Sequence, residues 1–476
     1  MTLLKSVFIA LFIISSVFAL KQSDFVEDLL AEKVSHQKTK MSLNKPGTEQ
    51  IKGGNSVSDN VPLFLLARIN HPMESIKLRT IRKLYCSHTI YTYGSIKEKV
   101  DTLFGCVNHN KLISRKSLIA LSKSRFILTD IHYLNPRYKV LKVNNIDFFE
   151  NPMDYPLYTS ISKSTRSSFN LITKLTITGV TAITRATGKA ADRYGPNFLI
   201  QKVKDEFKTS DFVHLSNEVS IMKNYRYGKT LRFATKERDI NVLLKLNPSL
   251  IVELTGNHNR DYGNRAFLYT LKWYKNHGVR TFGGGKNPME ASKPLILKLK
   301  DGTRLAFIGF NQSCPLKECA KKRNEPGANP YNRAKARKTL RKLRKQGIHF
   351  IIASVQFNER DSYLPFIDQK KISKDLIDFG ADMVYGSQAH QIQVVEYYKG
   401  KPIYYGLGNF LFDQIHRLGV RQGMFLHLYF LNGRLLQIKP VFTYISNKRR
   451  PILATRQQKS LIMRKIYREK LLYGSK

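Results

Sequence analysis

Side chains able to carry acid–base or metal chemistry follow five apolar segments of the chain. Glu218 follows DFVHLS, Asn257, His258 and Asp261 follow SLIVEL, Gln356 follows HFIIASV, Gln388 and His390 follow ADMVYG, and Asn409 follows PIYYG. Loops that follow the carboxyl ends of parallel strands meet at one edge of a sheet. Imidazole and carboxylate groups gathered there can transfer protons or bind a divalent ion. The spacing therefore predicts one polar site built from five loops.

The elements that would position these side chains alternate between strands and helices. Apolar strand-like segments such as LITKLTIT and RLAFIGF are separated by segments of helical pattern. Helices are predicted over Tyr262–His277 and Ser362–Phe379, each followed by a glycine suited to a C-terminal cap. The last two strands, MFLHLYF and LLQIKPVF, are joined by an Asn-Gly hairpin signal. This pattern indicates a layered α/β domain that ends in β-structure.

Three motifs within this domain carry a family resemblance. They are LSNEVS, GNHNRDYG and the long segment GADMVYGSQAHQIQVVEYYKGKPIYYGLGNFLFD at 380–413. Together they resemble the CapA family of poly-γ-glutamate capsule-synthesis proteins, over about 175–413. The resemblance implies an α/β fold of the calcineurin-like metallophosphatase type, an α/β/β/α sandwich of two sheets packed face to face with flanking helices. It also implies a role in the synthesis or export of poly-γ-glutamate.

The family's metal positions are only partly kept in this sequence. Val180 stands where the family has an aspartate, and Gln356 and Gln388 stand where it has histidines. A two-metal centre needs several anionic or imidazole ligands, so the resemblance implies that a tight dinuclear site is lost. The alternative is one divalent ion (Zn, Mn or Fe), whose identity the sequence leaves open. Its ligands would be Glu218, Asn257, His258 and His390.

Each remaining polar residue has a functional and a structural interpretation. His258, His390 and Asp261 are the catalytic candidates, although His258 could simply orient Asp261 within its loop. Glu218 could simply neutralise Arg185, and Asn409 could hydrogen-bond the loop backbone. The candidates for binding a substrate are Arg185, Gln356, Gln388 and Asn409.

The sequence of the N-terminal third indicates four segments ahead of the main domain. Residues 1–19 read as a signal peptide, 20–60 as a flexible polar leader, and 61–157 as a small α/β module with a loose resemblance to a lobe of phosphate-type periplasmic binding proteins. A polar connector then leads to the domain at 170–445, and 446–476 reads as a basic tail. We therefore expect a secreted or lumenal protein, with anchoring by an uncleaved N-terminus as the alternative.

Export also determines how the four cysteines are interpreted. In an oxidising compartment an even number of cysteines is most simply paired locally. This predicts a Cys86–Cys106 disulfide and a Cys314–Cys319 disulfide. No second pair stands at the spacing of a zinc finger, which disfavours a metal site of cysteines.

The formal net charge of +45 points to an anionic partner. The candidates are poly-γ-glutamate or another acidic polymer, a membrane-bound synthase complex, and an anionic membrane or cell surface; the signal peptide disfavours nucleic acid. Residues 321–345 hold eleven of the basic residues and one acid, with Ala336, Leu340 and Leu343 in one apolar stripe. This segment is either a solvated amphipathic helix or a ridge that binds polyanions. A general lysine bias on solvated faces is the alternative explanation of the charge.

Two functions remain from the sequence. The first is a non-enzymatic or weakly enzymatic accessory that binds poly-γ-glutamate during synthesis, export or packaging. The second is a metal-dependent hydrolase of phosphoester bonds or of the polymer's amide bonds, using His258 or His390 for proton transfer. The replaced ligands favour the binding role, while catalysis stays open.

Overall fold

The computed structural model describes residues 61–110, 126–159, 169–314 and 318–473, which lie in one unit that begins at Asp59. The expected signal peptide and leader lie outside the described residues. Among the described residues, no helix combines the length and apolar character needed to cross a bilayer.

The N-terminal α/β segment has a four-stranded sheet of its own, in the order β3-β4-β1-β5. Its strands are β1 (Phe64–Arg68), β3 (Ile90–Thr92), β4 (Phe126–Thr129) and β5 (Tyr138–Val140), with β2 (Ser75–Ile76) paired to β6 (Lys142–Val143) at its side. Helices α2 (Leu78–Cys86) and α3 (Gly94–Phe104) accompany the sheet. The predicted Cys86–Cys106 disulfide is formed between the last residue of α2 and the turn after α3, with the Cα atoms 5.7 Å apart.

The following domain contains two larger sheets. The first has the order β12-β11-β8-β7-β22-β23-β24, with β21 beside β7, and the second has the order β14-β15-β17-β18-β20-β19. The first sheet consists of β7 (Thr173–Thr181), β8 (Phe212–Asn217), β11 (Leu250–Glu253), β12 (Arg280–Phe282), β21 (Asn409–Leu411), β22 (Gln422–Leu431), β23 (Arg434–Ile445) and β24 (Pro451–Leu453). The second consists of β14 (Leu295–Lys298), β15 (Arg304–Asn311), β17 (Phe350–Gln356), β18 (Met383–Ser387), β19 (Val395–Tyr398) and β20 (Lys401–Tyr404). The site strands β8, β11, β17 and β18 run parallel to their neighbours within each sheet.

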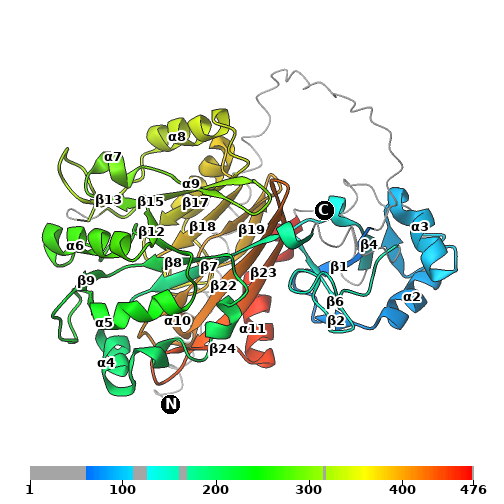
Figure 1. Ribbon diagram of the computed structural model, residues 1–476, viewed down its shortest axis with the longest axis horizontal. Helices are drawn as coiled ribbons and strands as arrows, with labels where there is room; N and C mark the ends of the chain where they lie inside the picture. Colours follow the sequence, from blue (N-terminus) through cyan, green and yellow to red (C-terminus); the bar gives the residue numbers. More distant parts are fainter. Residues whose placement is uncertain (1–60, 111–125, 160–168, 315–317, 474–476) are drawn as a thin grey trace, which may run out of the picture. The chain divides into compact units, whose positions relative to one another are not determined.

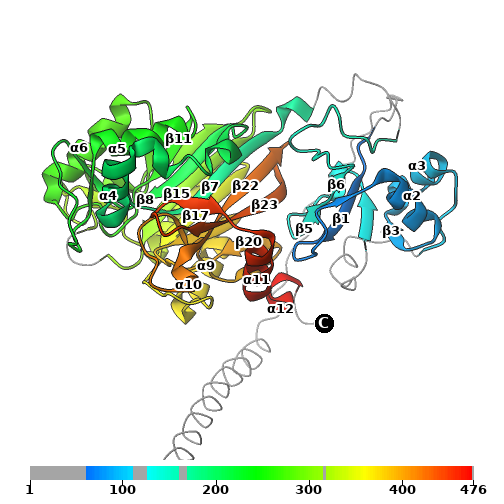
Figure 2. The ribbon, with the colours of Figure 1, turned by 90° about the horizontal axis from the view of Figure 1, so that it is seen from below.

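Helices cover the outer face of each sheet (Figure 1). On β8, Val213 and Leu215 pack with the helices outside, so the intervening His214 faces the space between the sheets. The first sheet is covered by α4 (Arg185–Tyr194), α5 (Glu237–Ile240) and α6 (Gly263–Asn276), and the second by α8 (Arg333–Lys345) and α9 (Ile367–Phe379). Three hydrophobic clusters fill the three spaces between these layers. The predicted α/β/β/α sandwich is thus confirmed, and both views show the layers (Figure 2).

Short elements complete the chain. They are β9 (Ser220–Met222), β10 (Ala234–Lys236), β13 (Gly284–Gly285), β16 (Gly327–Ala328), α7 (Pro288–Ala291), α10 (Leu418–Arg421), α11 (Arg456–Ile466), α12 (Glu469–Tyr473) and four 3₁₀ helices, Ile131–Tyr133, Pro196–Leu199, Lys204–Phe207 and Asn241–Lys245.

Helix and hairpin ends follow local chemistry. Helix α6 ends before Gly278, which takes a φ of 69° that favours glycine. Helix α9 begins at Ile367, five residues later than predicted, because Pro365 disfavours helical geometry in the residue before it. Asn432 and Gly433 have φ values of 51° and 73°, which suits the tight turn between β22 and β23.

The segment expected as a basic tail is folded. It forms β24, α11 and α12, and Ile462, Ile466 and Leu472 are buried in the main core. In α11, Ile462, Met463 and Ile466 are buried while Arg456, Arg464 and Lys465 are exposed, so the positive charge does not prevent docking.

Candidate functional site

Gln356, at the end of β17, lies at the centre of the predicted polar site. Its amide nitrogen donates to Glu218 Oε1 at 3.1 Å, to Asn257 Oδ1 at 3.3 Å and, by a short contact, to Gln388 Oε1. The Gln356 carbonyl accepts a hydrogen bond from the Ser387 hydroxyl, which fixes the orientation of the amide. Loops after β8, β11, β17 and β18 are therefore brought together as predicted. The NH₂ group of Gln356 thus lies where the acceptor oxygens of Glu218, Asn257 and Gln388 converge.

Glu218 is fully buried at this centre, and its second oxygen, Oε2, has no hydrogen-bond partner. Burial raises the pKa of the Glu218 carboxyl above its usual value, although His390, His258 and the Gln356 hydrogen bond act in the opposite direction. A carboxyl in this state holds its proton more tightly than an exposed one. Because metal binding requires the deprotonated carboxylate, the raised pKa opposes it.

His258 and Asp261 form a local pair in the loop after β11. Nδ1 of His258 lies 2.7 Å from Asp261 Oδ2, which also accepts the backbone N–H of Phe233 at 2.6 Å. The imidazole stacks on the Phe233 ring at 3.9 Å between centroids. These contacts hold the ring with its Nδ1 committed to Asp261.

His390 is also held by a hydrogen bond and a ring contact. Its Nδ1 lies 2.8 Å from Asn409 Oδ1, and its ring stacks on Phe412 at 5.1 Å. The Asn409 amide nitrogen in turn donates to the carbonyl of Val420 at 2.9 Å. Asn409 therefore hydrogen-bonds backbone, as its structural interpretation expected, and it also orients His390.

Arg185 is paired with Asp413, so the idea that Glu218 neutralises it is wrong. The guanidinium makes two hydrogen bonds to the Asp413 carboxylate, and the backbone N–H of Ala186 adds a third at 3.2 Å. Its carbon lies 4.6 Å from the Phe233 ring centroid and 4.9 Å from that of Phe412. The same two rings thus carry both histidines and the guanidinium.

The donor set does not fit a pair of divalent ions. Val180 is buried in β7, opposite Ser216 of β8, and supplies no ligand atom. Gln356 and Gln388 supply neutral amides that already bond each other, and Gln388 adopts a φ of 77° to do so. Within the described residues, no three His, Cys, Asp or Glu side chains come together in a metal-binding group. Glu218 Oε2, which is buried without a hydrogen-bond partner, stays available to a single ion.

A buried polar network beneath the site was not predicted from the sequence. Tyr385 donates to Glu253 Oε2 at 2.9 Å, Ser354 donates to Glu253 Oε1 at 2.8 Å, and His214 Nε2 lies 2.8 Å from the Tyr385 oxygen. Burial raises the pKa of Glu253, but His214, Thr255 and Ser354 outweigh it and lower the pKa. The network joins the two sheets on the four strands that lead into the site. The sequence feature that could have predicted this network is the glutamate within the apolar run LIVEL.

The predicted Cys314–Cys319 disulfide is also formed, with the Cα atoms 5.6 Å apart. Its loop contacts the loop that carries His258, because Arg260 donates to the Cys319 carbonyl at 3.4 Å and pairs with Glu325 at 3.2 Å. Asn311 adds a hydrogen bond to the Thr255 carbonyl at 2.7 Å. The disulfide loop thus supports one side of the site.

Two curated relatives and one solved structure are similar to this chain. The PGA biosynthesis protein CapA of Bacillus subtilis is 28% identical over 233 residues, which cover 48% of this chain and 60% of the relative. The capsule biosynthesis protein CapA of Bacillus anthracis is 27% identical over 248 residues, covering 50% and 60%. The chain thus spans less than two thirds of the length of these relatives. A solved structure, the calcineurin-like phosphoesterase YfkN of Bacillus subtilis, aligns over 62% of this chain and 95% of its own, at 12% identity and a TM-score of 0.35.

The family model described as bacterial capsule synthesis protein PGA_cap matches residues 174–414, about half of the chain. That range contains the whole second sheet, the strands β8, β11, β12 and β21 of the first sheet, and every loop of the polar site. The chain therefore belongs to the PGA_cap family.

Proposed function

We propose that this protein is an exported accessory of poly-γ-glutamate synthesis, export or packaging that works by binding the acidic polymer rather than by cleaving it. The observation that carries the proposal is the Gln356 amide, which bonds Glu218, Asn257 and Gln388 at the centre of the site. An amide nitrogen in this position satisfies oxygens that would otherwise face a cation. The site is then stable without a metal and lacks a metal-activated water as nucleophile.

The net charge gives a second line of support. Each γ-linked glutamate keeps a free carboxylate, so the polymer is a dense polyanion, and the chain carries 80 Lys and Arg against 35 Asp and Glu. Binding between such partners releases counterions, so the affinity falls steeply as salt is added. A membrane-bound synthase complex that delivers the polymer is the expected setting.

A retention experiment tests the proposal. The full chain is immobilised, and poly-γ-glutamate is applied at low ionic strength and then eluted with a salt gradient. We expect retention at low salt and complete release by high salt, whereas neutral dextran of similar length passes through. Salt-insensitive retention, or equal retention of dextran, would contradict the proposal.

The hydrolase is the second candidate, and it is favoured by the raised pKa of Glu218 beside the His258–Asp261 pair. These groups could supply a proton and hold a base in place. Elemental analysis for Zn, Mn and Fe, together with assays on phosphodiesters and on the polymer, separates the two functions. Brisk turnover with stoichiometric metal would establish the hydrolase and remove the binding role.

A further inference from the structure

Helix α8 exposes a row of cations on the side opposite its buried stripe. Ala336, Leu340 and Leu343 face the second sheet and are buried in its core. The basic face of α8 is defined here by six exposed cations that form no ion pair among the described residues, Lys335, Arg337, Lys338, Arg341, Lys342 and Lys345. No acidic residue occurs within the helix.

The cations of this face have no counter-charges in the described part of the chain. Arg333 pairs with Asp375 and Arg344 with Asp382, but none of the six side chains of the basic face forms an ion pair there. Like charges three and four residues apart destabilise a helix, and a lysine in the first turn opposes the helix dipole. Lys342 and Lys345 lie in the last turn, where the dipole favours a cation, but fold stability gives no reason for the other four cations.

The neighbouring helix α9 shows that the chain does not place uncompensated lysines on every helix. Its lysines alternate with Asp368, Asp375 and Asp378, and Lys374 pairs with Glu396. The two helices cover the same sheet and lie side by side (Figure 1). Of these two neighbouring helices, α9 holds three lysines and three aspartates, so the excess of positive charge over this sheet lies on α8.

The spacing of the cations suits a γ-linked polymer. Side chains four residues apart on a helix, such as Lys338 and Lys342 or Arg341 and Lys345, are separated by about 6 Å along the axis. An extended α-linked residue spans about 3.5 Å, and the two additional methylenes of a γ-linkage lengthen the repeat to about 6 Å. One carboxylate per repeat thus recurs at the interval of the cations. From Lys335 to Lys345 the face extends about 15 Å, enough for roughly three repeats.

We propose that the basic face of α8 is the surface on which an extended stretch of γ-linked polyglutamate docks, an assignment that rests on the proposed function. The carboxylates replace the counter-charges that the helix lacks, and the polymer lies along the helix axis. The buried stripe keeps the helix rigid on its sheet, so the cations are presented without refolding. The polymer passes over this face and is not taken into the site around Gln356.

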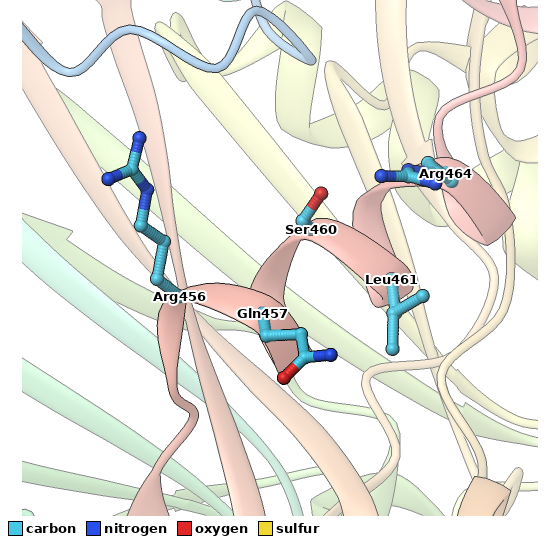
Figure 3. A pocket seen from close by; sticks show the side chains of 5 residues that line it. All are labelled: Arg456, Gln457, Ser460, Leu461 and Arg464. Atoms are coloured by element: carbon cyan, nitrogen blue, oxygen red, sulfur yellow. The ribbon is translucent and has the colours of Figure 1, made fainter.

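Two triple variants of equal charge test the assignment. Lys338→Gln, Lys342→Gln and Lys345→Gln neutralise the basic face of α8. Arg456→Gln, Arg464→Gln and Lys465→Gln neutralise three exposed cations of α11, of which Arg456 and Arg464 project on either side of Ser460 (Figure 3). Each variant removes three of the 45 net positive charges, so the bulk charge is matched.

The measurement is the affinity of the full chain for poly-γ-glutamate at about 50 mM salt, with the salt dependence of that affinity. The α8 variant should bind on the order of 30-fold more weakly, at a few-fold per cation removed, and should show a smaller salt slope. The α11 variant should lose less than threefold. Equal losses in the two variants, or a larger loss in the α11 variant, would overturn the assignment to α8.

The design separates this inference from the proposed function. If the unaltered chain does not retain the polymer, the proposed function fails. If the unaltered chain and the α8 variant bind equally well, the function stands and the docking surface is wrong. Circular dichroism of both variants shows whether the helices remain folded, and Lys338→Arg with Lys342→Arg and Lys345→Arg should restore binding because the charges are kept.

Discussion

The polar site and the basic face of α8 treat charge in opposite ways. In the site, Arg185 is paired with Asp413, His258 with Asp261, and Glu218 accepts a hydrogen bond from Gln356. On α8, six cations stand together without an acid in the helix. In the site, the polar groups bond one another. On α8, the cations are left available to a partner.

This difference indicates that the polar site contributes to folding stability and that the basic face of α8 contributes to binding. Buried groups that satisfy one another determine the geometry of the loops, and removing one of them strands its partners. Exposed cations add little to folding, so their removal should be felt mainly in binding. Changes in the site should therefore alter the free energy of unfolding, and changes on α8 should not lower it.

The largest effect is expected for Gln356→Leu. The substitution keeps the approximate size of the side chain but leaves the oxygens of Glu218, Asn257 and Gln388 without their shared donor. Removing one partner of a buried charged group costs about 3 kcal/mol. Urea denaturation at neutral pH measures the loss.

Gln393→Leu is the matched control for this loss. Gln393 is also fully buried, but its amide bonds Gln369 and the Leu364 carbonyl, and neither of these is a carboxylate. Its loss should be smaller, about 1–2 kcal/mol. A smaller loss for Gln356→Leu than for Gln393→Leu would show that Glu218 does not depend on the central amide.

Restoring the metal ligands that the family resemblance implies should convert the site, whose polar groups now bond one another, into a metal site. Val180→Asp, Gln356→His and Gln388→His together add one carboxylate and two imidazoles beside Glu218. Histidine is tolerated at 388 because the left-handed backbone there, with φ at 77°, is one that histidine adopts more readily than most residues. Elemental analysis should find at least one bound Zn or Mn, and metal at about 100 times its Kd should stabilise the fold by about 2.7 kcal/mol.

The control for the restored site adds Glu218→Gln to the triple variant. This fourth change removes the central carboxylate, so the metal content should fall well below one equivalent. A folded triple variant that takes up no metal would show that the loops are not aligned for coordination.

Glu218→Gln by itself should stabilise the protein at neutral pH by on the order of 1 kcal/mol. Burial raises the pKa of Glu218 in the folded state above the unfolded value near 4.5, so the native state prefers the protonated carboxyl. The destabilising effect of the charge is absent below about pH 4.5 and grows as the pH rises through the folded pKa. The gain from the substitution should therefore be present at pH 7 and vanish near pH 4.

Glu150→Gln should show the opposite dependence on pH. Burial raises the pKa of Glu150, but hydrogen bonds from Lys174, Tyr429 and Thr209 outweigh it and lower the pKa to about 2. The ionised carboxylate then stabilises the fold above the unfolded pKa, and this contribution is lost as the pH falls towards 2. Denaturation curves for both variants between pH 3 and 7 should diverge in opposite directions, and parallel curves would contradict both assignments.

The sequence was sufficient to predict where the site loops meet, because parallel strands deliver Glu218, Asn257 and Gln356 to one edge. It could not pair Arg185 with Asp413, which lies 228 residues away and is chosen by the tertiary fold. The inter-sheet network of Glu253 and Tyr385 was hidden for the same reason, since its partners come from different sheets.

The C-terminal segment shows how charge can obscure a folding signal. Ten basic residues in 446–476 suggest a solvated tail, yet Ile462 and Ile466 stand one helical turn apart and are buried. Apolar spacing was the better guide than total charge at that end of the chain. The same rule succeeded for α8, where Ala336, Leu340 and Leu343 are the buried stripe.

The smallest effect is expected for the α8 variant, and its sign distinguishes the two regions. Replacing Lys338, Lys342 and Lys345 by Gln removes like-charge neighbours at three- and four-residue spacing along the helix, including Lys338 with Lys342 and Arg341 with Lys345. Five such pairs are lost at about 0.2–0.5 kcal/mol each, and the lost dipole interactions of Lys342 and Lys345 in the last turn offset part of this gain, so the variant should be more stable by about 0.5–1 kcal/mol at low salt. The gain should vanish near 1 M salt, where the Debye length is about 3 Å. Thermal denaturation of the variant and of the unaltered chain at both salt concentrations measures it. A loss of stability, or a gain that salt does not change, would mean that these lysines already have partners within the protein and are not free to bind a polyanion.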